Sequence, residues 1–243
     1  MDHENSRQRV GLGRALCKLG CCSRSQAFVW IREGRVRVNQ IVQRDPERSV
    51  SLERDRIEVD GQPITSAPKF YLMLNKPRGV VTTAADEKGR KTVYQLLEQD
   101  LPWVAPVGRL DKASEGLLLL TNDSEWGARV LAPETHLAKT YHVQVARVVD
   151  EKLVTAISQG VRAPEGDLLR VKSVGILRGG AKNTWLEIVL DEGRNRHIRR
   201  LLAAFDVEVL RLIRVAIGPL VLGELPKGAS RSLTRAEKAA LSE

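Results

Sequence analysis

The chain has 243 residues, and its 39 Lys and Arg residues against 30 Asp and Glu residues give a formal net charge of +9. Hydrophobic residues make up 42% and charged residues 28%, which is typical of a folded protein and excludes a disordered one. The basic excess indicates a polyanionic partner, because Lys and Arg that contact phosphates release counterions. Aromatic residues make up only 4%, which argues against a protein that holds single strands on many stacked rings but allows one ring at one base.

The three cysteines, Cys17, Cys21 and Cys22, are close neighbours in the sequence, which excludes a disulfide-rich secreted scaffold and favours a reducing compartment. A zinc site needs four ligands, and the sequence has no second Cys/His pair at zinc-finger spacing. We therefore interpret the thiols as small residues of a helical hairpin and expect no metal. No apolar stretch approaches the roughly 20 residues that span a bilayer. We expect a cytoplasmic protein with no membrane partner.

Residues 1–66 are predicted to form a small domain that begins with a polar tail. Apolar residues at helical spacing, a capping serine and terminal glycines predict two short helices. Alternating apolar residues predict two short strands, and an Asp-Gly turn follows the second. The helices are expected over residues 9–18 and 24–33, and the strands over residues 36–39 and 56–59.

Basic residues gather around this predicted hairpin and the strand after it. Charge alone leaves two interpretations equally open, a solvated charged face and a phosphate-binding surface, although arginine suits bidentate contact with phosphate. The run CKLGCCSRSQAFVWIREGRVRVNQ resembles an S4 RNA-binding domain, and the resemblance covers residues 8–63. It implies a basic face that binds structured RNA, with the candidate residues Arg14, Lys18, Arg24, Arg35 and Arg37.

Residues 67–243 are predicted to form a larger α+β domain. Most connections are too short for parallel β-α-β crossovers, so we expect a mixed, largely antiparallel sheet flanked by helices. Four consecutive leucines after Gly116 indicate a strand that is buried on both faces. Strands are expected over residues 70–74, 116–121, 140–148, 184–190, 207–215 and 220–222, and helices over residues 92–98, 124–131, 150–159 and 195–205.

The segment PVGRLDKASEGLLLLTND places Asp111 in a loop just before this apolar strand. A carboxylate beside a buried core is costly unless it is paired, caps the backbone or has a function. Capping or turning the backbone is the more common role of such an aspartate, and the residue pattern alone favours that role over catalysis.

The segment DEGRNRHIRRLL carries four arginines on a turn that enters a helix. They can form a basic face that touches RNA phosphates, with Arg194, Arg196 and Arg200 as the candidates. Helical spacing also places Arg199 at the edge of the buried stripe, where it could pair with a buried carboxylate and lower the pKa of that acid.

The segment KTYHVQV is predicted to be a strand. Strand alternation leaves two interpretations of Tyr141 open, a core aromatic residue and a platform on which one base stacks.

Four segments resemble, in their order behind an S4-like domain, the RsuA/RluB/RluE/RluF group of rRNA pseudouridine synthases: LNKPRGVVTT, VGRLDKASEGLLLLTND, KTYHVQV and EGRNRHIRRLL. The match covers residues 69–225. It implies an enzyme that isomerises uridine, breaking the glycosidic bond to nitrogen, turning the uracil and rejoining it through carbon. It also implies no metal, nucleotide or other cofactor, and a partner that is ribosomal RNA or a pre-ribosomal particle. We expect a monomer.

The resemblance assigns roles to individual residues. Asp111 would be the catalytic carboxylate, Tyr141 the ring that packs on the target base, and Arg199 the basic partner of Asp111. Arg109 would help to fill the space left by the extruded nucleotide, and Leu212 would form an apolar floor of the base pocket. Neither the residues nor the resemblance decides whether Asp111 attacks the ribose or takes a proton beside it.

Two positions depart from the pattern of the group, and neither belongs to the proposed chemistry. Ser124 stands where glycine is common, and His197 stands where glutamine is common, which leaves the hydrogen bonding around His197 open.

Two other functions compete with the isomerase. A non-catalytic RNA-binding or ribosome-assembly factor of the S4 type predicts loss of the three candidate catalytic residues, yet all three are present. A metal-dependent nuclease would use Asp111 with Asp191 and Glu192, but the sequence lacks clustered carboxylates.

Overall fold

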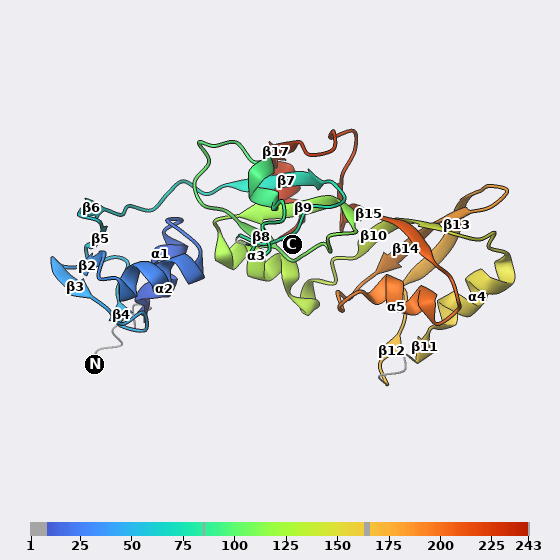
Figure 1. The fold of residues 1–243 in the computed structure, drawn as a ribbon, viewed down its shortest axis with the longest axis horizontal. Helices are drawn as coiled ribbons and strands as arrows, with labels where there is room; N and C mark the ends of the chain where they lie inside the picture. The colour runs from blue at the N-terminus through green and yellow to red at the C-terminus, as the bar shows by residue number, and fades with distance from the viewer. Residues whose placement is uncertain (1–8, 85, 163–165, 243) are drawn as a thin grey trace. The chain divides into compact units, whose positions relative to one another are not determined.

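A computed structural model describes residues 9–84, 86–162 and 166–242 of the chain. These residues form two compact units (Figure 1). The first unit contains the described residues up to Phe70 together with Glu98–Ala105 and Thr121–Ser124, and the second contains the rest. No helix among the described residues is long and apolar enough to cross a membrane. The domain boundary expected after residue 66 stays a prediction.

The first unit packs two short helices and small sheets around one apolar core. Leu12 and Leu16 of the first helix and Ile31 of the second are fully buried in this core. Its elements are β1 (Val10–Gly11), α1 (Leu12–Lys18), α2 (Arg24–Arg32), β2 (Val36–Val38), β3 (Ile41–Gln43), β4 (Ser49–Val50), β5 (Ile57–Val59) and β6 (Gln62–Pro63).

Local sequence signals explain where several of these elements begin and end. The Oγ of Ser23 accepts a hydrogen bond from the backbone N–H of Gln26 and so caps α2, as the sequence predicts. Asp60 and Gly61 have φ values of 50° and 77°, which a two-residue hairpin turn between β5 and β6 requires. Helix α1 begins later than predicted because residues 10–11 instead pair with β4 as a strand.

The larger sheet has the strand order β13-β14-β10-β15-β9-β7-β17, with β16 beside β15 and β8 beside β9. Strand β10 is antiparallel to both β14 and β15, whereas β15 pairs with β9 in parallel. The prediction of an α+β fold with a mixed, mostly antiparallel sheet is confirmed. The strands are β7 (Tyr71–Lys76), β8 (Ala105–Val107), β9 (Glu115–Thr121), β10 (Lys139–Val145), β13 (Ser173–Gly179), β14 (Thr184–Leu190), β15 (Val209–Ile217), β16 (Leu220–Val221) and β17 (Ser230–Ser232).

Helices pack on this sheet around two apolar cores. Helices α4 and α5 pack on the part of the sheet that contains β10, β13 and β14 (Figure 1), where Ile157, Leu201 and Leu202 are fully buried. Trp126 of α3 is buried in the second core, against residues of β7 and β9. The remaining elements are η1 (Val93–Leu96) and η2 (Pro133–Thr135), which are 3₁₀ helices, α3 (Ser124–Leu131), α4 (Glu151–Gln159), α5 (His197–Ala203), α6 (Arg235–Ala240), and the short strand pair β11 (Val161–Arg162) and β12 (Leu168–Leu169).

Several predicted boundaries differ from the structure. Residues 195–196 precede α5 as a turn, because Arg196 has a φ of 49° and cannot continue a right-handed helix. Strand β10 ends at Val145, three residues before the predicted end. The helix expected over residues 92–98 is the 3₁₀ helix η1 with a capping box at Thr92.

Candidate active site

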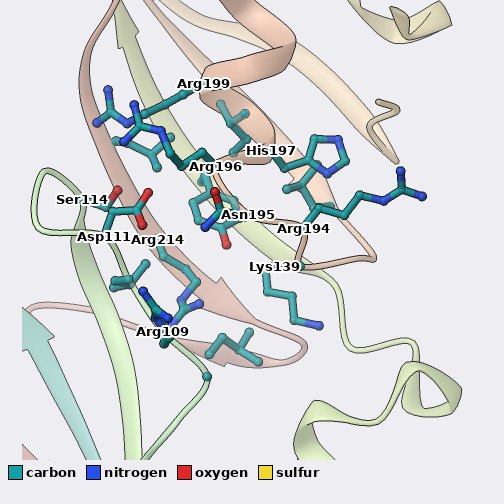
Figure 2. A pocket seen from close by; sticks show the side chains of 18 of the residues that line it. Arg109, Asp111, Ser114, Lys139, Arg194, Asn195, Arg196, His197, Arg199 and Arg214 are labelled. Atoms are coloured by element: carbon teal, nitrogen blue, oxygen red, sulfur yellow. The ribbon is translucent and has the colours of Figure 1, made fainter. Parts of the chain in front are cut away.

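The second unit contains a cavity of about 510 Å³ between the loop before β9, the strands β10 and β15, and the start of α5 (Figure 2). The three predicted catalytic residues, Asp111, Tyr141 and Arg199, all line it. Arg109 and Leu212 line the same cavity. The fold therefore brings together candidate residues from four segments that are far apart in the sequence.

The loop that carries Asp111 is fixed by hydrogen bonds from the segment after β7. The Oγ1 of Thr82 donates to the carbonyl oxygen of Leu110 at 2.8 Å and accepts from the N–H of Leu110 at 3.4 Å. The N–H of Gly79 donates to the carbonyl oxygen of Lys112 at 2.8 Å. Because these bonds hold the residues on both sides of Asp111, the LNKPRGVVTT segment sets the position of the carboxylate.

Lys76, which was not among the candidate residues predicted from the sequence, adds a third anchor to this loop. Its side chain is fully buried, and its Nζ donates to the carbonyl oxygen of Ser114 at 2.8 Å. Burial lowers the pKa of Lys76 to about 8, although the nearby carboxylates of Glu115 and Asp111 oppose this shift. A lysine inside an apolar strand, directly before Pro77, was the available signal.

The carboxylate of Asp111 is half-buried and faces the cavity. Within the part of the chain that the structure describes, this carboxylate makes no hydrogen bond and no ion pair. The turn at this position is made by the backbone instead, since the carbonyl oxygen of Asp111 accepts from the N–H of Ser114 at 3.0 Å. The capping role considered from the sequence is therefore not what this side chain does in the structure.

Arg199 approaches the same loop from α5. Its Nη2 donates to the carbonyl oxygen of Ala113 at 3.2 Å, and its Nη1 donates to that of Val209 at 3.3 Å. Burial lowers the pKa of Arg199, whereas the negative charge of Asp111 raises it, so the two charges are near enough to interact. The guanidinium binds the backbone of the Asp111 loop, and a direct ion pair between the two side chains stays a prediction.

Tyr141 and Leu212 supply the apolar part of the cavity. Tyr141 lies on β10, half-buried against the core beneath α4 and α5. Leu212 on β15 is only 8% exposed and pairs with Val143 of β10. A flat ring and a branched aliphatic side chain that border one cavity suit an aromatic base.

The other arginines near the cavity differ in whether a carboxylate of the protein already binds them. Arg194 donates to Glu192 at 2.8 Å, and Arg200 donates to Asp167 at 2.9 Å. Arg109 and Arg196 are exposed at the cavity and have no hydrogen bond or ion pair among the described residues. These two guanidinium groups are therefore the ones most open to an anionic ligand.

His197 lines the cavity but is almost fully buried. Its side chain is 2% exposed, and its Nδ1 lies 3.5 Å from the Oε1 of Glu192. Burial lowers the pKa of His197, opposed by the charge of Glu192. In Figure 2 the ring points away from Asp111, which is consistent with a structural role.

In the first unit, the candidate RNA-binding residues lie on or beside α1, α2 and β2. Arg14, Arg24 and Arg37 are exposed, whereas Lys18 is half-buried. Arg35 makes a two-pronged contact with Asp60, with Nη2 at 2.6 Å and Nε at 2.9 Å, so its guanidinium already holds the β5–β6 turn.

Within residues 9–84, 86–162 and 166–242, no cluster of three or more His, Cys, Asp or Glu side chains could hold a metal ion. Glu192, which the nuclease alternative requires, is ion-paired with Arg194. The three cysteines are free thiols, and Cys22 is buried in the core of the first unit.

Comparisons with known proteins identify the families that the two parts of the chain match. Residues 70–204 match the RNA pseudouridylate synthase family, and residues 12–57 match the S4 domain. A protein of Aquifex aeolicus named as an RNA pseudouridine synthase is 41% identical over 233 residues, which are 96% of this chain and 93% of that protein. The ribosomal large subunit pseudouridine synthase B of Bacillus subtilis is 35% identical over 224 residues, covering 92% of this chain and 91% of that protein.

A solved structure gives the same result at the level of the fold. The crystal structure of a pseudouridylate synthase aligns with 96% of this chain and 99% of its own, at 31% sequence identity and a TM-score of 0.67. The family match covers more than half of the chain, including Asp111, Tyr141 and Arg199. This protein therefore belongs to the RNA pseudouridylate synthase family and carries an S4 domain before its synthase domain.

Proposed function

We propose that this protein converts one or more uridines of ribosomal RNA to pseudouridine, with Asp111 as the catalytic carboxylate. The observation that carries the proposal is the carboxylate of Asp111, which has no hydrogen bond or ion pair among the described residues and faces a cavity bordered by Tyr141 and Arg199 in a chain of this family. The name of the Bacillus subtilis relative points to large-subunit rRNA as the first substrate to test.

A base in folded RNA must leave its stack before the bond to its sugar can be reached, at a cost of a few kcal/mol. The exposed Arg109 and Arg196 at the cavity can offset this cost by contacting phosphates or by occupying the vacated space. The extruded uracil would then stack on Tyr141 above Leu212.

The proposed reaction is an isomerisation that needs no added atom. The bond between ribose C1′ and uracil N1 breaks, the uracil turns, and a bond forms between C1′ and C5. The proton on C5 leaves, and N1 takes up a proton, so the product has the composition of the substrate. Asp111 either attacks C1′ or removes a proton from the ribose, and both steps require its ionised form.

The binding partners follow from this substrate. We propose that the exposed arginines of the S4 domain, Arg14, Arg24 and Arg37, contact rRNA or a pre-ribosomal particle. An enzyme that acts on rRNA would work in the cytoplasm of a bacterial cell. The monomeric state belongs to the same proposal, because all the proposed catalytic residues line a cavity within one chain.

The test compares the wild-type protein with an Asp111→Asn variant on rRNA isolated from a strain that lacks this protein. Mapping pseudouridine in the small- and large-subunit rRNAs is expected to reveal a site that the wild type modifies. The variant is expected to modify this site at a rate at least about 100-fold lower. Asp100→Asn is the matched control, because Asp100 is an exposed aspartate outside the cavity. Wild-type rates from Asp111→Asn, or no pseudouridine from the wild type on either rRNA, would refute the proposal.

A further inference from the structure

Arg214 lines the wall of the cavity with a buried guanidinium, and none of the catalytic roles proposed so far involves it. Its side chain is only 6% exposed, and its Nε donates to the carbonyl oxygen of Leu117 at 2.8 Å. Its Nη2 is buried and has no hydrogen-bond partner among the described residues. A buried donor on a charged group is costly when it stays unpaired, so its site calls for an acceptor that the described chain does not supply.

The register of the sheet places this donor next to the proposed base platform. Arg214 on β15 lies directly opposite Tyr141 on β10, and Leu212 lies two residues away on the same face of β15. Side chains at opposed positions of two antiparallel strands are neighbours. In Figure 2 Arg214 lies beside Asp111 and Arg109, on the side of the cavity away from His197. A base stacked on Tyr141 would therefore present its edge to Arg214.

The chemistry of that edge fits a guanidinium. Arginine offers only donors, and uracil presents the carbonyl oxygens at C2 and C4 as acceptors. Cytosine has an amino group in place of the C4 oxygen, which a guanidinium cannot bind. Asp111 is the only carboxylate that lines this cavity within the described part of the chain, so a ligand is the natural source of the missing acceptor.

We propose that the Nη2 of Arg214 donates a hydrogen bond to a carbonyl oxygen of the target uracil and is a catalytic residue of the isomerisation. The inference rests on the proposed function and adds a named contact to it. When the C1′–N1 bond breaks, its electron pair stays with the ring and spreads onto the C2 and C4 oxygens. A preorganised cation at one of these oxygens stabilises the charge as it develops.

The first test is an Arg214→Met variant, which keeps an unbranched but shorter side chain and removes the guanidinium with all of its donors. Single-turnover isomerisation of rRNA is expected to slow at least about 100-fold, as for the loss of one preorganised donor, while the dissociation constant for the RNA changes by less than about threefold. Arg178→Met is the matched control, since Arg178 lies exposed on β13 and does not line the cavity. A rate for Arg214→Met within about threefold of the wild type would overturn the inference.

The second test identifies the oxygen through the substrate. Transcripts that carry 2-thiouridine or 4-thiouridine replace one carbonyl oxygen with sulfur, a weaker acceptor. The wild type is expected to isomerise one of the two thio substrates more slowly than unmodified uridine. The Arg214 variant is expected to isomerise that thio substrate at the same reduced rate as it isomerises unmodified uridine. Only a contact of Arg214 with the C4 oxygen would also select against cytidine, because cytosine differs from uracil at C4. Equal slowing of both proteins on both thio substrates would contradict a contact with either oxygen.

Two controls separate this inference from other failures. If the wild type forms no pseudouridine on unmodified rRNA, the proposed function fails before Arg214 is tested. If Arg214→Met does not fold, Arg214→Lys retains a cation that can reach Leu117 and takes its place in both tests. The expected loss is then again in the rate of isomerisation and not in RNA binding, and a wild-type response of Arg214→Lys to both thio substrates would overturn the inference.

Discussion

Gly116 lies directly against the backbone of Arg214, at the point where β9 and β15 pair in parallel. A Cβ atom at Gly116 would stand 2.2 Å from the carbonyl oxygen of Arg214, and the φ of Gly116 is +102°. This contact joins the strand that follows the Asp111 loop to the strand that carries Leu212. One close approach of two backbones thus sets the spacing between two walls of the cavity.

Gly116→Ala should therefore disrupt the protein strongly. The new methyl group would force the two strands apart, and an alanine is strained at this φ, so we expect the free energy of unfolding to fall by roughly 3 kcal/mol. Urea denaturation measures the change. Gly175→Ala is the control, because Gly175 lies on β13 with no atom within 4 Å of its Cβ position, and it should change stability by less than about 1 kcal/mol. Equal losses for the two variants would contradict the close-contact explanation.

The buried amine of Lys76 should make stability depend on alkaline pH. Its pKa is about 8 in the folded protein because of burial, against an ordinary value of 10.5. Below pH 8 both states carry the proton, and between the two values only the unfolded state retains it. The unfolded state then binds more protons, so this residue makes the free energy of unfolding rise with pH across that window.

Lys76→Met removes this pH-dependent contribution to the free energy of unfolding. Unfolding free energies of the wild type and the variant, measured from pH 7 to pH 11, should diverge by about 2–3 kcal/mol in favour of the wild type as the pH rises. Lys69→Met is the control, because Lys69 is exposed. Parallel curves for the wild type and Lys76→Met would show that the amine keeps an ordinary pKa.

Thr82→Val tests whether the segment after β7 positions the Asp111 loop. The substitution keeps the shape of the side chain and removes both hydrogen bonds between the Oγ1 of Thr82 and the backbone of Leu110. A small displacement of the loop should lower the isomerisation rate roughly 10- to 100-fold without changing RNA affinity. Thr155→Val removes a hydrogen bond of the same length on α4 and should leave the rate unchanged. A normal rate for Thr82→Val would mean that the other anchors hold the loop alone.

The exposed arginines of the S4 domain should contribute to RNA binding through phosphates. Reversing Arg14 and Arg37 to glutamate should weaken binding to rRNA at least about tenfold, with a slope of affinity against salt that is shallower by about 1 for each lost contact. Arg48 and Arg54, exposed in the same unit but outside the predicted set, give a control with the same change in charge. If both double variants lose affinity equally, net charge rather than this surface explains the binding.

Local pattern predicted the elements whose own residues decide their structure. Helix α3 over Ser124–Leu131 and strand β14 over Thr184–Leu190 match their predicted ranges, because each carries its amphipathic or alternating pattern within itself. Strands β13 and β17 and helix α6 were missed. β13 is mostly exposed at the end of the sheet path, and β17 is only three residues long, so pairing with a neighbour defines them more than their own composition.

The sequence by itself determined the α+β class and predicted a set of candidate site residues in four ordered motifs. These depend on residue type and short spacing, which the chain contains locally. Tertiary structure alone decided which charged side chains are paired within the protein and which are left to bind a ligand. Arg35 is held by Asp60 and Arg200 by Asp167, while the carboxylate of Asp111 stays unpaired among the described residues. Such pairing and burial arise only when distant segments meet. They make Lys76 a buried anchor of the Asp111 loop and Arg214 a buried cation that lines the cavity.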